Sequence, residues 1–389
     1  MATASGYEFR LPRAIITGPG CIDRLGEQAR ALGIRRALIV TDPGVRQLPY
    51  VDQALGYLGA AGISGVVFAG VVPEPLEPNV NAGLAAFLEA DCDGIIAVGG
   101  GSSIDVAKAV AALATSGGRM ADYEGANRIP GRRHPLIAVP TTAGTGSEVT
   151  RNTIITDVER DVKMLIQSPH IIPDVAIVDP LLTVTLPPHI TMATGVDALT
   201  HAIEAYVSRR AQPLTDVLAL EAIRLIAGNL RQAWANPDDL EARGQMARAS
   251  LVAGMAFGNS SVALVHGMAR PLGAHFHLSH GLSNATILAP VMEYSLLGNP
   301  PRFADIAEAM GERVAGLSVQ DAARRAVDAV RRLADDLRVP TLSGAGVDPE
   351  RLRALAPRLA ADAIASGSPA NNPRRASVDD IVALYLRAL

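Results

Sequence analysis

The acidic and imidazole side chains of this chain follow a spacing that could bind a metal ion. Asp197 and His201 lie four residues apart in a helical pattern, so they project from one face, one turn from each other. His266 and His280 could complete a four-ligand set, since four of the eight histidines fall within 265–281. Three imidazoles and one carboxylate suit Fe²⁺ or Zn²⁺. The alternative is a polar cluster of histidines beside a helical ion pair.

A metal site of this kind requires the chain to turn back between His266 and His280. A straight helix would hold these residues roughly 21 Å apart along its axis, too far for one ion. Pro271 and Gly273 could break the helix, and His280 could begin a new element that points back. We therefore expect the break near these two residues.

A glycine-rich turn predicts a phosphate site. Gly99, Gly100, Gly101 and Ser102 follow an apolar run and are followed at once by a helical pattern. Glycines allow close approach of a ligand, and a helix N-terminus offers free N–H groups and a positive dipole end. The G-x-G-x-x-G fingerprint is absent, because Ile104 stands at its third glycine. A tight strand–helix turn without a ligand is the alternative.

A second loop strengthens this interpretation. Residues 140–148, with Thr141, Thr142 and Thr145, follow another apolar run, and two such loops at the carboxyl ends of parallel strands would flank one crevice. Asp42 ends an earlier run, where a carboxylate could accept hydrogen bonds from a ribose and repel a 2′-phosphate, favouring NAD over NADP. Asp42 could instead be a helix-capping residue.

The elements that must position these residues change in character along the chain. Up to residue 180, short β-branched runs alternate with helical patterns, which is typical of parallel strands with crossover helices. After Pro188 only long helical patterns follow. We predict an α/β dinucleotide-binding domain with a parallel sheet over residues 1–185 and an all-helical metal-binding domain over residues 186–389. The five predicted strands lie at 37–42, 65–70, 94–101, 135–142 and 175–180.

Composition excludes several classes of protein. The chain has 389 residues, a net charge of −4 and 19% charged residues, which does not favour a nucleic-acid surface or disorder. Two cysteines, Cys21 and Cys92, favour a reducing, cytoplasmic setting over a disulfide framework. We expect no membrane span, because the charge-free stretch 250–269 contains several polar residues, and no signal peptide.

Four ordered motifs make the chain similar to the iron-containing (group III) alcohol dehydrogenases: GGGSSIDVAK (99–108), PTTAGTGSEVT (140–150), GVDALTHAIEAYVS (195–208) and HGMARPLGAHFHLSHGLSNA (266–285). The resemblance implies that Asp197, His201, His266 and His280 are metal ligands. It also implies that the two loops hold NAD, with Asp42 at the ribose, Lys163 near the adenosine and Asn152 in the substrate pocket.

The chain departs from this pattern at Arg270. Members of the lactaldehyde and propanediol type carry a histidine there that is implicated in proton transfer, whereas arginine stays protonated and cannot act as an ordinary acid or base. Arg270 could instead bind a carboxylate, sulfonate or phosphonate, or point outward. His275 or His277 could relay protons, or line the surface. Glu204 could support the ligands or be an exposed helix carboxylate.

The implied activity is metal-dependent hydride transfer between NAD(H) and a small alcohol, aldehyde or hydroxy acid, in a homo-oligomer such as a homodimer. A hydroxyacid–oxoacid transhydrogenase is an alternative, because Arg270 could hold an acid. A lyase of the dehydroquinate-synthase type is more remote, since it would need a pocket rich in Lys and Arg. A metal-binding protein without catalytic activity is a further possibility.

Overall fold

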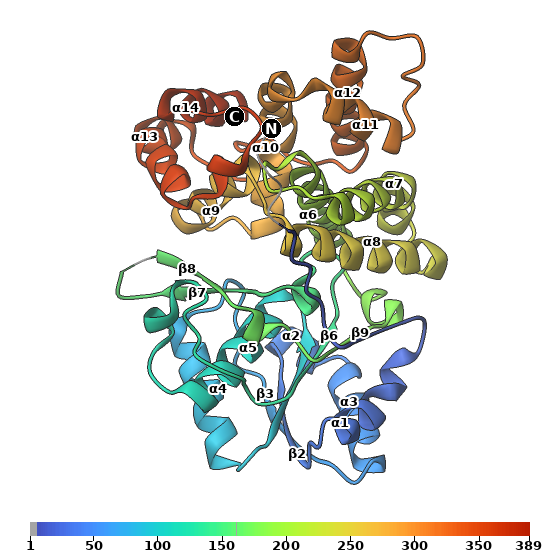
Figure 1. Cartoon of the computed structure of the whole chain (residues 1–389), viewed down its shortest axis with the longest axis vertical. Helices are drawn as coiled ribbons and strands as arrows, with labels where there is room; N and C mark the ends of the chain where they lie inside the picture. Colours follow the sequence, from blue (N-terminus) through green and yellow to red (C-terminus); the bar gives the residue numbers. More distant parts are fainter. Residues whose placement is uncertain (1–5, 161) are drawn as a thin grey trace.

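The computed structural model describes residues 6–160 and 162–389, which form an α/β half followed by a helical half (Figure 1). Six parallel strands build the main sheet, in the order β1-β9-β6-β4-β2-β3. This confirms the predicted fold class. The strands are β1 Ala14–Thr17, β2 Arg36–Val40, β3 Ser64–Phe68, β4 Gly94–Gly99, β6 Leu136–Pro140 and β9 Val175–Val178.

Helices cover both faces of this sheet, which explains why its central strands are almost continuously apolar. Helices α1 and α3 pack on one face, and α4 and α5 pack on the other, while the short α2 follows β2. Because these strands are parallel neighbours, the carboxyl ends of β2, β4 and β6 lie next to each other on the same side of the sheet. The helices are α1 Leu25–Ala31, α2 Pro43–Arg46, α3 Tyr50–Ala60, α4 Glu77–Glu89 and α5 Gly101–Ser116.

A second, three-stranded sheet was not predicted. It consists of β5 Gly125–Ala126, β7 Asn152–Asp157 and β8 Val162–Gln167, with β7 and β8 antiparallel. Buried and partly exposed residues alternate along β7 and β8, the pattern of strands with one covered face. This sheet carries Asn152 and Lys163 toward the helical half.

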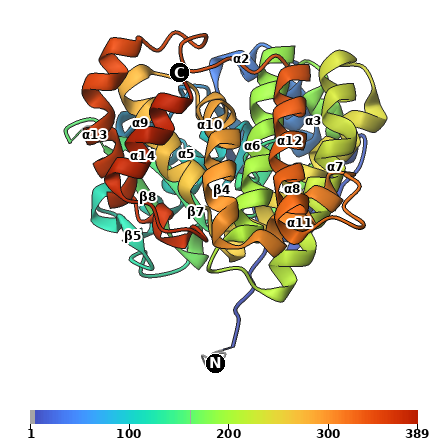
Figure 2. The same ribbon diagram turned by 90° about the horizontal axis from the view of Figure 1, so that it is seen from above.

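The helical half follows without further strands among the described residues. Helix α6 lies at its centre, next to α10, with α9, α13 and α14 on one side and α7, α8 and α12 on the other (Figure 2). Because neighbours surround it, α6 is buried on nearly all sides, including its polar residues. The helices are α6 Pro188–Val207, α7 Pro213–Ala235, α8 Leu240–Asn259, α9 Leu264–Phe276, α10 His280–Ser295, α11 Pro300–Ala309, α12 Val319–Asp336, α13 Pro349–Ala365 and α14 Val378–Arg387.

The last main-sheet strand ends at Val178 and α6 begins at Pro188, so the predicted boundary at residue 185 falls in the connection between them. The division into two domains stays a prediction. Among the described residues, no single helix is long and apolar enough to cross a bilayer. Helices α8 and α9 meet these criteria only as a pair, and they are bent by 103° at their junction.

The helix break expected at Pro271 and Gly273 is wrong in position. Helix α9 runs through both residues to Phe276, and the break lies at 277–279. His277 has a left-handed φ of 57° and donates its N–H to the Gly273 carbonyl at 3.1 Å, which ends the helix. His280 then begins α10, as expected.

The two halves meet at a close contact between glycines. Gly146, in the loop after β6, has a left-handed φ of 59° and lies against Gly254 of α8. A Cβ on Gly254 would lie 2.8 Å from the Gly146 Cα, a separation that real side chains do not adopt. Backbone therefore packs directly on backbone where the loop of residues 140–150 meets the helical half.

We predict that Gly254→Ala pushes α8 away from this loop and destabilises the protein by about 1–3 kcal/mol, the usual cost of overpacking. Thermal unfolding checks this. Gly244→Ala, on the same helix but with open space around it, is the control and should be neutral or slightly stabilising. Equal unfolding temperatures for the two variants would contradict the prediction.

Candidate metal and cofactor site

The structure brings the four predicted metal ligands together. Asp197 and His201 come from the middle of α6, His266 from the first turn of α9, and His280 from the first residue of α10. One ligand atom from each lies within 4.8 Å of the others. The Asp197 Oδ1 atom is 3.6 Å from His266 Nε2 and 3.7 Å from His280 Nε2. These separations are close to those between ligands that share one ion.

The chemistry of this cluster fits a divalent cation. His266 Nε2 and His201 Nδ1 are buried and have no hydrogen-bond partner among the residues that the structure describes. Burial lowers the pKa of His201 to about 3, so its ring is neutral. Burial alone would raise the pKa of Asp197, but the three neighbouring imidazoles outweigh it and hold that pKa far below its usual range. The cluster thus combines a carboxylate with at least one neutral, unpartnered imidazole, which a metal ion would satisfy.

Glu204 orients His266 within this cluster. It is buried, and its carboxylate accepts a hydrogen bond from His266 Nδ1 at 2.7 Å. The same carboxylate accepts the backbone N–H groups of Ala263 and Val265, at 2.7 and 2.6 Å. It therefore occupies the N-terminus of α9, where negative charge is favourable, and turns His266 Nε2 toward Asp197. This geometry favours a role for Glu204 in supporting the metal ligands over the alternative of an exposed helix carboxylate.

Two residues of the cluster were missed by sequence reasoning. Asn284 donates its side-chain N–H to Asp197 Oδ1 at 2.7 Å, and Phe257 stacks on His201 with ring centroids 4.1 Å apart. Asn284 follows His280 by four residues, so the spacing that suggested Asp197 and His201 also contained a signal for this pair. Phe257 has no such signal, because it comes from α8.

The two loops predicted to bind the cofactor touch each other at the carboxyl end of the sheet. Gly100 precedes α5, and a Cβ on Gly101 would lie 2.8 Å from the Thr145 side chain. A Cβ on Gly100 would lie 3.4 Å from Thr142. Gly101, Ser102 and the next residue offer N–H groups that have no partner within the helix. Glycine at position 101 therefore allows the two loops to approach closely. The free N–H groups at the start of α5 fit a bound pyrophosphate.

Thr141 and Asp42 flank the same turn. Thr141 is buried and donates its N–H to the Gly99 carbonyl at 3.0 Å. Asp42 caps α2, accepting the N–H groups of Gly44 and Val45 at 2.9 Å, which was its alternative role. Its other oxygen lies 3.5 Å from Ser103 Oγ, so the carboxylate also faces the start of α5. A ribose-binding role for Asp42 stays a prediction.

A buried lysine supports the second loop. Lys108 of α5 donates to Ser147 Oγ, Thr150 Oγ1 and the Asn152 carbonyl, at 2.9, 3.2 and 2.7 Å. Burial lowers the pKa of Lys108 to about 8. Lys108 lies within the motif of residues 99–108, but the motif did not predict these contacts, which link α5 to the second loop and to β7.

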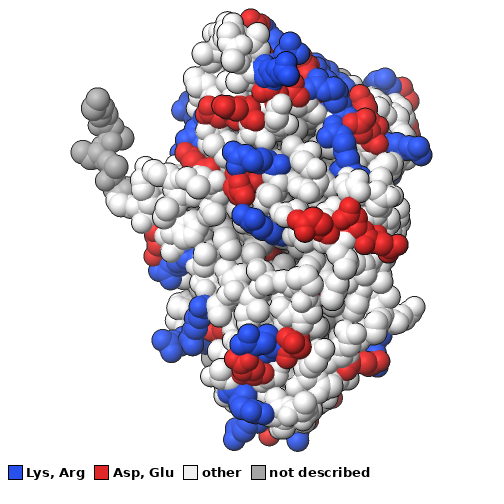
Figure 3. Space-filling model, turned by 90° about the vertical axis from the view of Figure 1, so that its right-hand side faces the viewer, with Lys and Arg blue, Asp and Glu red and all other residues white. Residues whose placement is uncertain are grey.

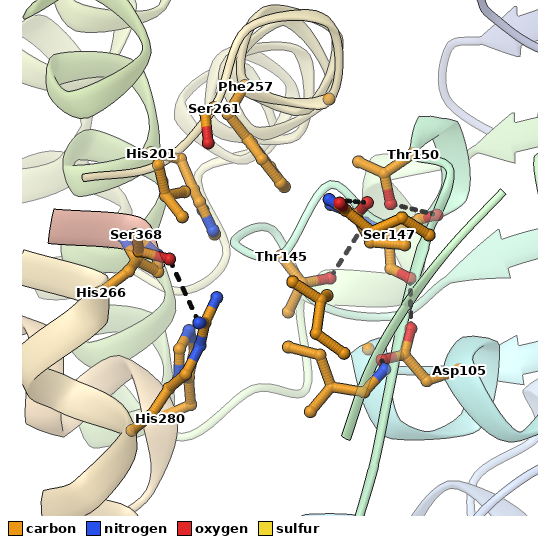
Figure 4. Close-up of a pocket in the computed structure, with 18 of the residues that line it drawn as sticks. Asp105, Thr145, Ser147, Thr150, His201, Phe257, Ser261, His266, His280 and Ser368 are labelled. Carbon is orange, nitrogen blue, oxygen red and sulfur yellow. Dashed lines mark hydrogen bonds between the residues drawn. The ribbon is translucent and has the colours of Figure 1, made fainter. Parts of the chain in front are cut away.

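A pocket between the halves joins the two sets of residues (Figure 4). Gly101, Ser102 and Thr145 line one wall, and the four proposed metal ligands line the other. The pocket holds about 1180 Å³ of empty space, including a part open to solvent. A nicotinamide and a small substrate could therefore meet between the phosphate loops and the metal cluster.

Asn152 and Lys163 lie in the same pocket. Asn152 accepts a hydrogen bond from Gln167 at 3.1 Å, and Lys163 forms an ion pair with Glu74 at 2.5 Å. Lys163 also lies beside Gly273 of α9. Asp42 does not line this pocket. The expected position of Lys163 near the adenosine therefore stays a prediction. The contact of Lys163 with α9 links this side chain to the helical half.

Arg270 lines the pocket, but His275 and His277 do not. His275 Nε2 faces Asp362 of α13 at 3.7 Å, and His277 is exposed at the end of α9. The structure therefore does not bring either histidine to the metal cluster, and a proton-relay role for them stays a prediction.

Comparisons with known proteins agree with this arrangement. One family model, described as iron-containing alcohol dehydrogenase, matches residues 12–180, and a second, described as the C-terminal part of the Fe-containing alcohol dehydrogenase family, matches residues 191–389. The chain is 45% identical over 385 residues to a 1,3-propanediol dehydrogenase of Klebsiella pneumoniae, with 98% of each chain covered. It is 40% identical over 382 residues to an NAD-dependent methanol dehydrogenase of Bacillus methanolicus, covering 98% of this chain and 99% of that relative.

The solved structures agree as well. A crystal structure of 1,3-propanediol oxidoreductase superposes with a TM-score of 0.96 at 44% identity, covering 99% of this chain and 100% of that one. Likeness of this extent runs through both halves and is not confined to the motifs. We conclude that the chain belongs to the iron-containing alcohol dehydrogenase family.

Proposed function

We propose that this oxidoreductase transfers hydride between NAD(H) and a small alcohol or aldehyde, with Fe²⁺ as its resident metal and Zn²⁺ as the alternative. The convergence of Asp197, His201, His266 and His280 opposite the phosphate loops carries this proposal. Nitrogen and oxygen ligands without a thiolate suit both metals. When bound, the metal supplies Lewis-acid polarisation of the substrate oxygen, and NAD supplies the hydride acceptor.

The chain's own residues position these groups. Glu204 and Asn284 hold His266 and Asp197 in fixed orientations, so little reorganisation is needed at the metal. The contact between Gly101 and Thr145 sets the spacing of the two phosphate loops. Phe257 stacks on His201 and adds an apolar surface to that side of the pocket. Together they hold the two reactants close across the boundary between the halves.

We also propose that the protein acts in the cytoplasm as a homo-oligomer, such as a homodimer. Both cysteines are free, which suits a reducing compartment. Strand β1 lies at the edge of the main sheet and could pair with a second copy. On the face drawn in Figure 3, acidic and basic side chains are interspersed, which does not favour a nucleic-acid partner. Sedimentation analysis tests the oligomer.

The transhydrogenase alternative keeps one observation in its favour, because Arg270 in the pocket could hold an acid. In a transhydrogenase, NAD stays bound between two half-reactions. Release of free NADH from a single alcohol substrate, followed by absorbance, supports the dehydrogenase. Turnover that requires an added oxoacid would support the alternative.

The first prediction from the proposed function concerns His266. Replacing it with Ala removes one ligand and should abolish metal binding and lower turnover at least about 100-fold, since a metal supplies several kcal/mol of stabilisation. Elemental analysis and NADH formation measure the two effects. His189→Ala, an exposed histidine on α6, is the control. Full activity of metal-free His266→Ala would refute metal catalysis.

A second prediction concerns Glu204. Glu204→Gln keeps the shape of the side chain but weakens its hold on His266, so metal affinity should fall about 10- to 100-fold. Metal titration by calorimetry measures this directly. The exposed Glu241→Gln on α8 should leave the affinity unchanged. Wild-type affinity in Glu204→Gln would show that the contact does not orient the ligand.

A third prediction concerns cofactor choice. Asp42 should repel the 2′-phosphate of NADP, so the wild type should prefer NAD. Asp42→Ser retains a capping oxygen for α2 but removes the charge, and the NADP-to-NAD ratio of kcat/KM should rise at least about tenfold. Equal use of both cofactors by the wild type would place Asp42 away from the ribose.

A further inference from the structure

Arg270 lies one helical turn after His266 on α9, so the two side chains share a face of the helix. Its guanidinium lines the pocket that contains the metal cluster. Arg270 Nη1 donates a hydrogen bond to Ser368 Oγ at 3.1 Å, and Figure 4 shows Ser368 on the same side of the pocket as His266. The outward-pointing alternative for Arg270 is therefore wrong.

This guanidinium lacks an anionic partner among the described residues. Its Nε is buried and has no hydrogen-bond partner. Burial lowers the pKa of Arg270, against the opposing effect of Glu204, but an arginine stays charged. The Glu204 carboxylate is already occupied by His266 and the first N–H groups of α9. A half-buried charge without an anionic partner is unfavourable, and a nearby metal cation makes it more so.

The hydroxyl partner of Arg270 is held firmly in place. Ser368 begins a short 3-10 helix, Ser368–Asn371, that packs on α9. A Cβ on Gly267 would lie 2.7 Å from Pro369, so this segment lies directly against the helix that carries Arg270. Asn371 also donates to Ser261 Oγ at 2.9 Å, in the pocket wall. The guanidinium and the Ser368 hydroxyl therefore form a preorganised pair of donors.

Two further arginines line the pocket. Arg151 and Arg210 line it without an ion pair among the described residues, and Arg151 Nε is buried without a partner. The three acidic lining residues already have partners: Asp197 belongs to the metal cluster, Glu74 pairs with Lys163, and Asp105 accepts hydrogen bonds from Ser147 and the Ile154 N–H. An anion entering this side of the pocket would meet unpaired guanidinium groups.

We propose that Arg270, assisted by Ser368, binds an oxyanion at the far end of the substrate, so that the enzyme acts on a short alcohol or aldehyde bearing a carboxylate or sulfonate. This rests on the proposed function and names its substrate class. A planar guanidinium fits such oxyanions through paired N–H donors. The NAD phosphates are a poorer match for this anion, because their predicted site at Gly99–Ser102 belongs to the opposite wall.

The reaction on such a substrate is a balanced two-electron oxidation. The C–H bond of the alcohol carbon breaks, and its electron pair and hydrogen pass to NAD⁺ as hydride. The hydroxyl proton leaves to water, and a carbon–oxygen double bond forms. The products are an aldehyde acid, NADH and H⁺. The anionic end takes no part in the bond changes, so its only role is to anchor the molecule beside the metal cluster.

Matched substrates test the proposal. Metal-loaded wild type should prefer 4-hydroxybutyrate over 1,4-butanediol, or 2-hydroxyethanesulfonate over ethylene glycol, and the preferred pair identifies the acid. In Arg270→Gln the acid-to-diol ratio of kcat/KM should fall about 10- to 100-fold, as expected for losing a hydrogen bond to a charged group. Arg270→His should shift it the same way. The surface variant Arg248→Gln should not.

Binding of unreactive anions gives a second readout. Butyrate or ethanesulfonate, titrated into the NAD⁺-loaded enzyme, should bind at least about tenfold more weakly to Arg270→Gln, and several-fold more weakly to Ser368→Ala, than to wild type. The Kd of NAD⁺ should stay unchanged, which separates substrate from cofactor phosphate. Diol preference in both pairs, an unchanged ratio in Arg270→Gln, or a weakened NAD⁺ Kd overturns the proposal. If the wild type oxidises neither acids nor diols yet binds the anions through Arg270, the anion site stands and the proposed function fails.

Discussion

The arrangement of the active-site half depends on one buried carboxylate. Glu204 sits in the middle of the helical bundle, where an unpaired charge would be costly, and it is satisfied by His266 and by the N-terminus of α9. The same contacts fix where α9 begins and which way His266 faces. Because α9 also carries Arg270, the position of the guanidinium follows from this junction. Loss of the carboxylate would disturb both the metal cluster and the substrate end of the pocket.

The second constraint is the close approach of the two halves. The loop after β6 is predicted to bind the cofactor with Thr142 and Thr145, and it also packs on α8 through Gly146. Buried Lys108 ties the same loop to α5, whose N-terminus faces the predicted phosphates. Neither the predicted cofactor site nor the proposed metal site therefore depends on an isolated loop. Each is held by a segment that is itself packed into a core, which is how a site can keep reacting atoms at a fixed separation.

Much of this could be predicted from the sequence, and the failures have physical reasons. Periodicity and the glycine-rich turn predicted the parallel sheet, and helical spacing grouped Asp197 with His201. The second sheet was missed because β7 and β8 alternate in polarity and form a local antiparallel pair rather than apolar runs. The helix break was misplaced because a proline inside a helix looks like an end, whereas the left-handed His277 is the actual stop. The direction in which His275 faces depends on α13, which no local pattern contains.

The pocket walls come from different halves of the chain. The four proposed ligands and Arg270 all belong to helices α6, α9 and α10, whereas the phosphate loops and Asp42 all belong to the α/β half. The two sets share no residue. Substitutions that retune metal or substrate choice can therefore accumulate in one half while cofactor choice is retuned in the other. Metal or substrate choice and cofactor choice can then change independently of each other. The contact between Gly146 and Gly254 must be kept in either case, because it holds the two halves together.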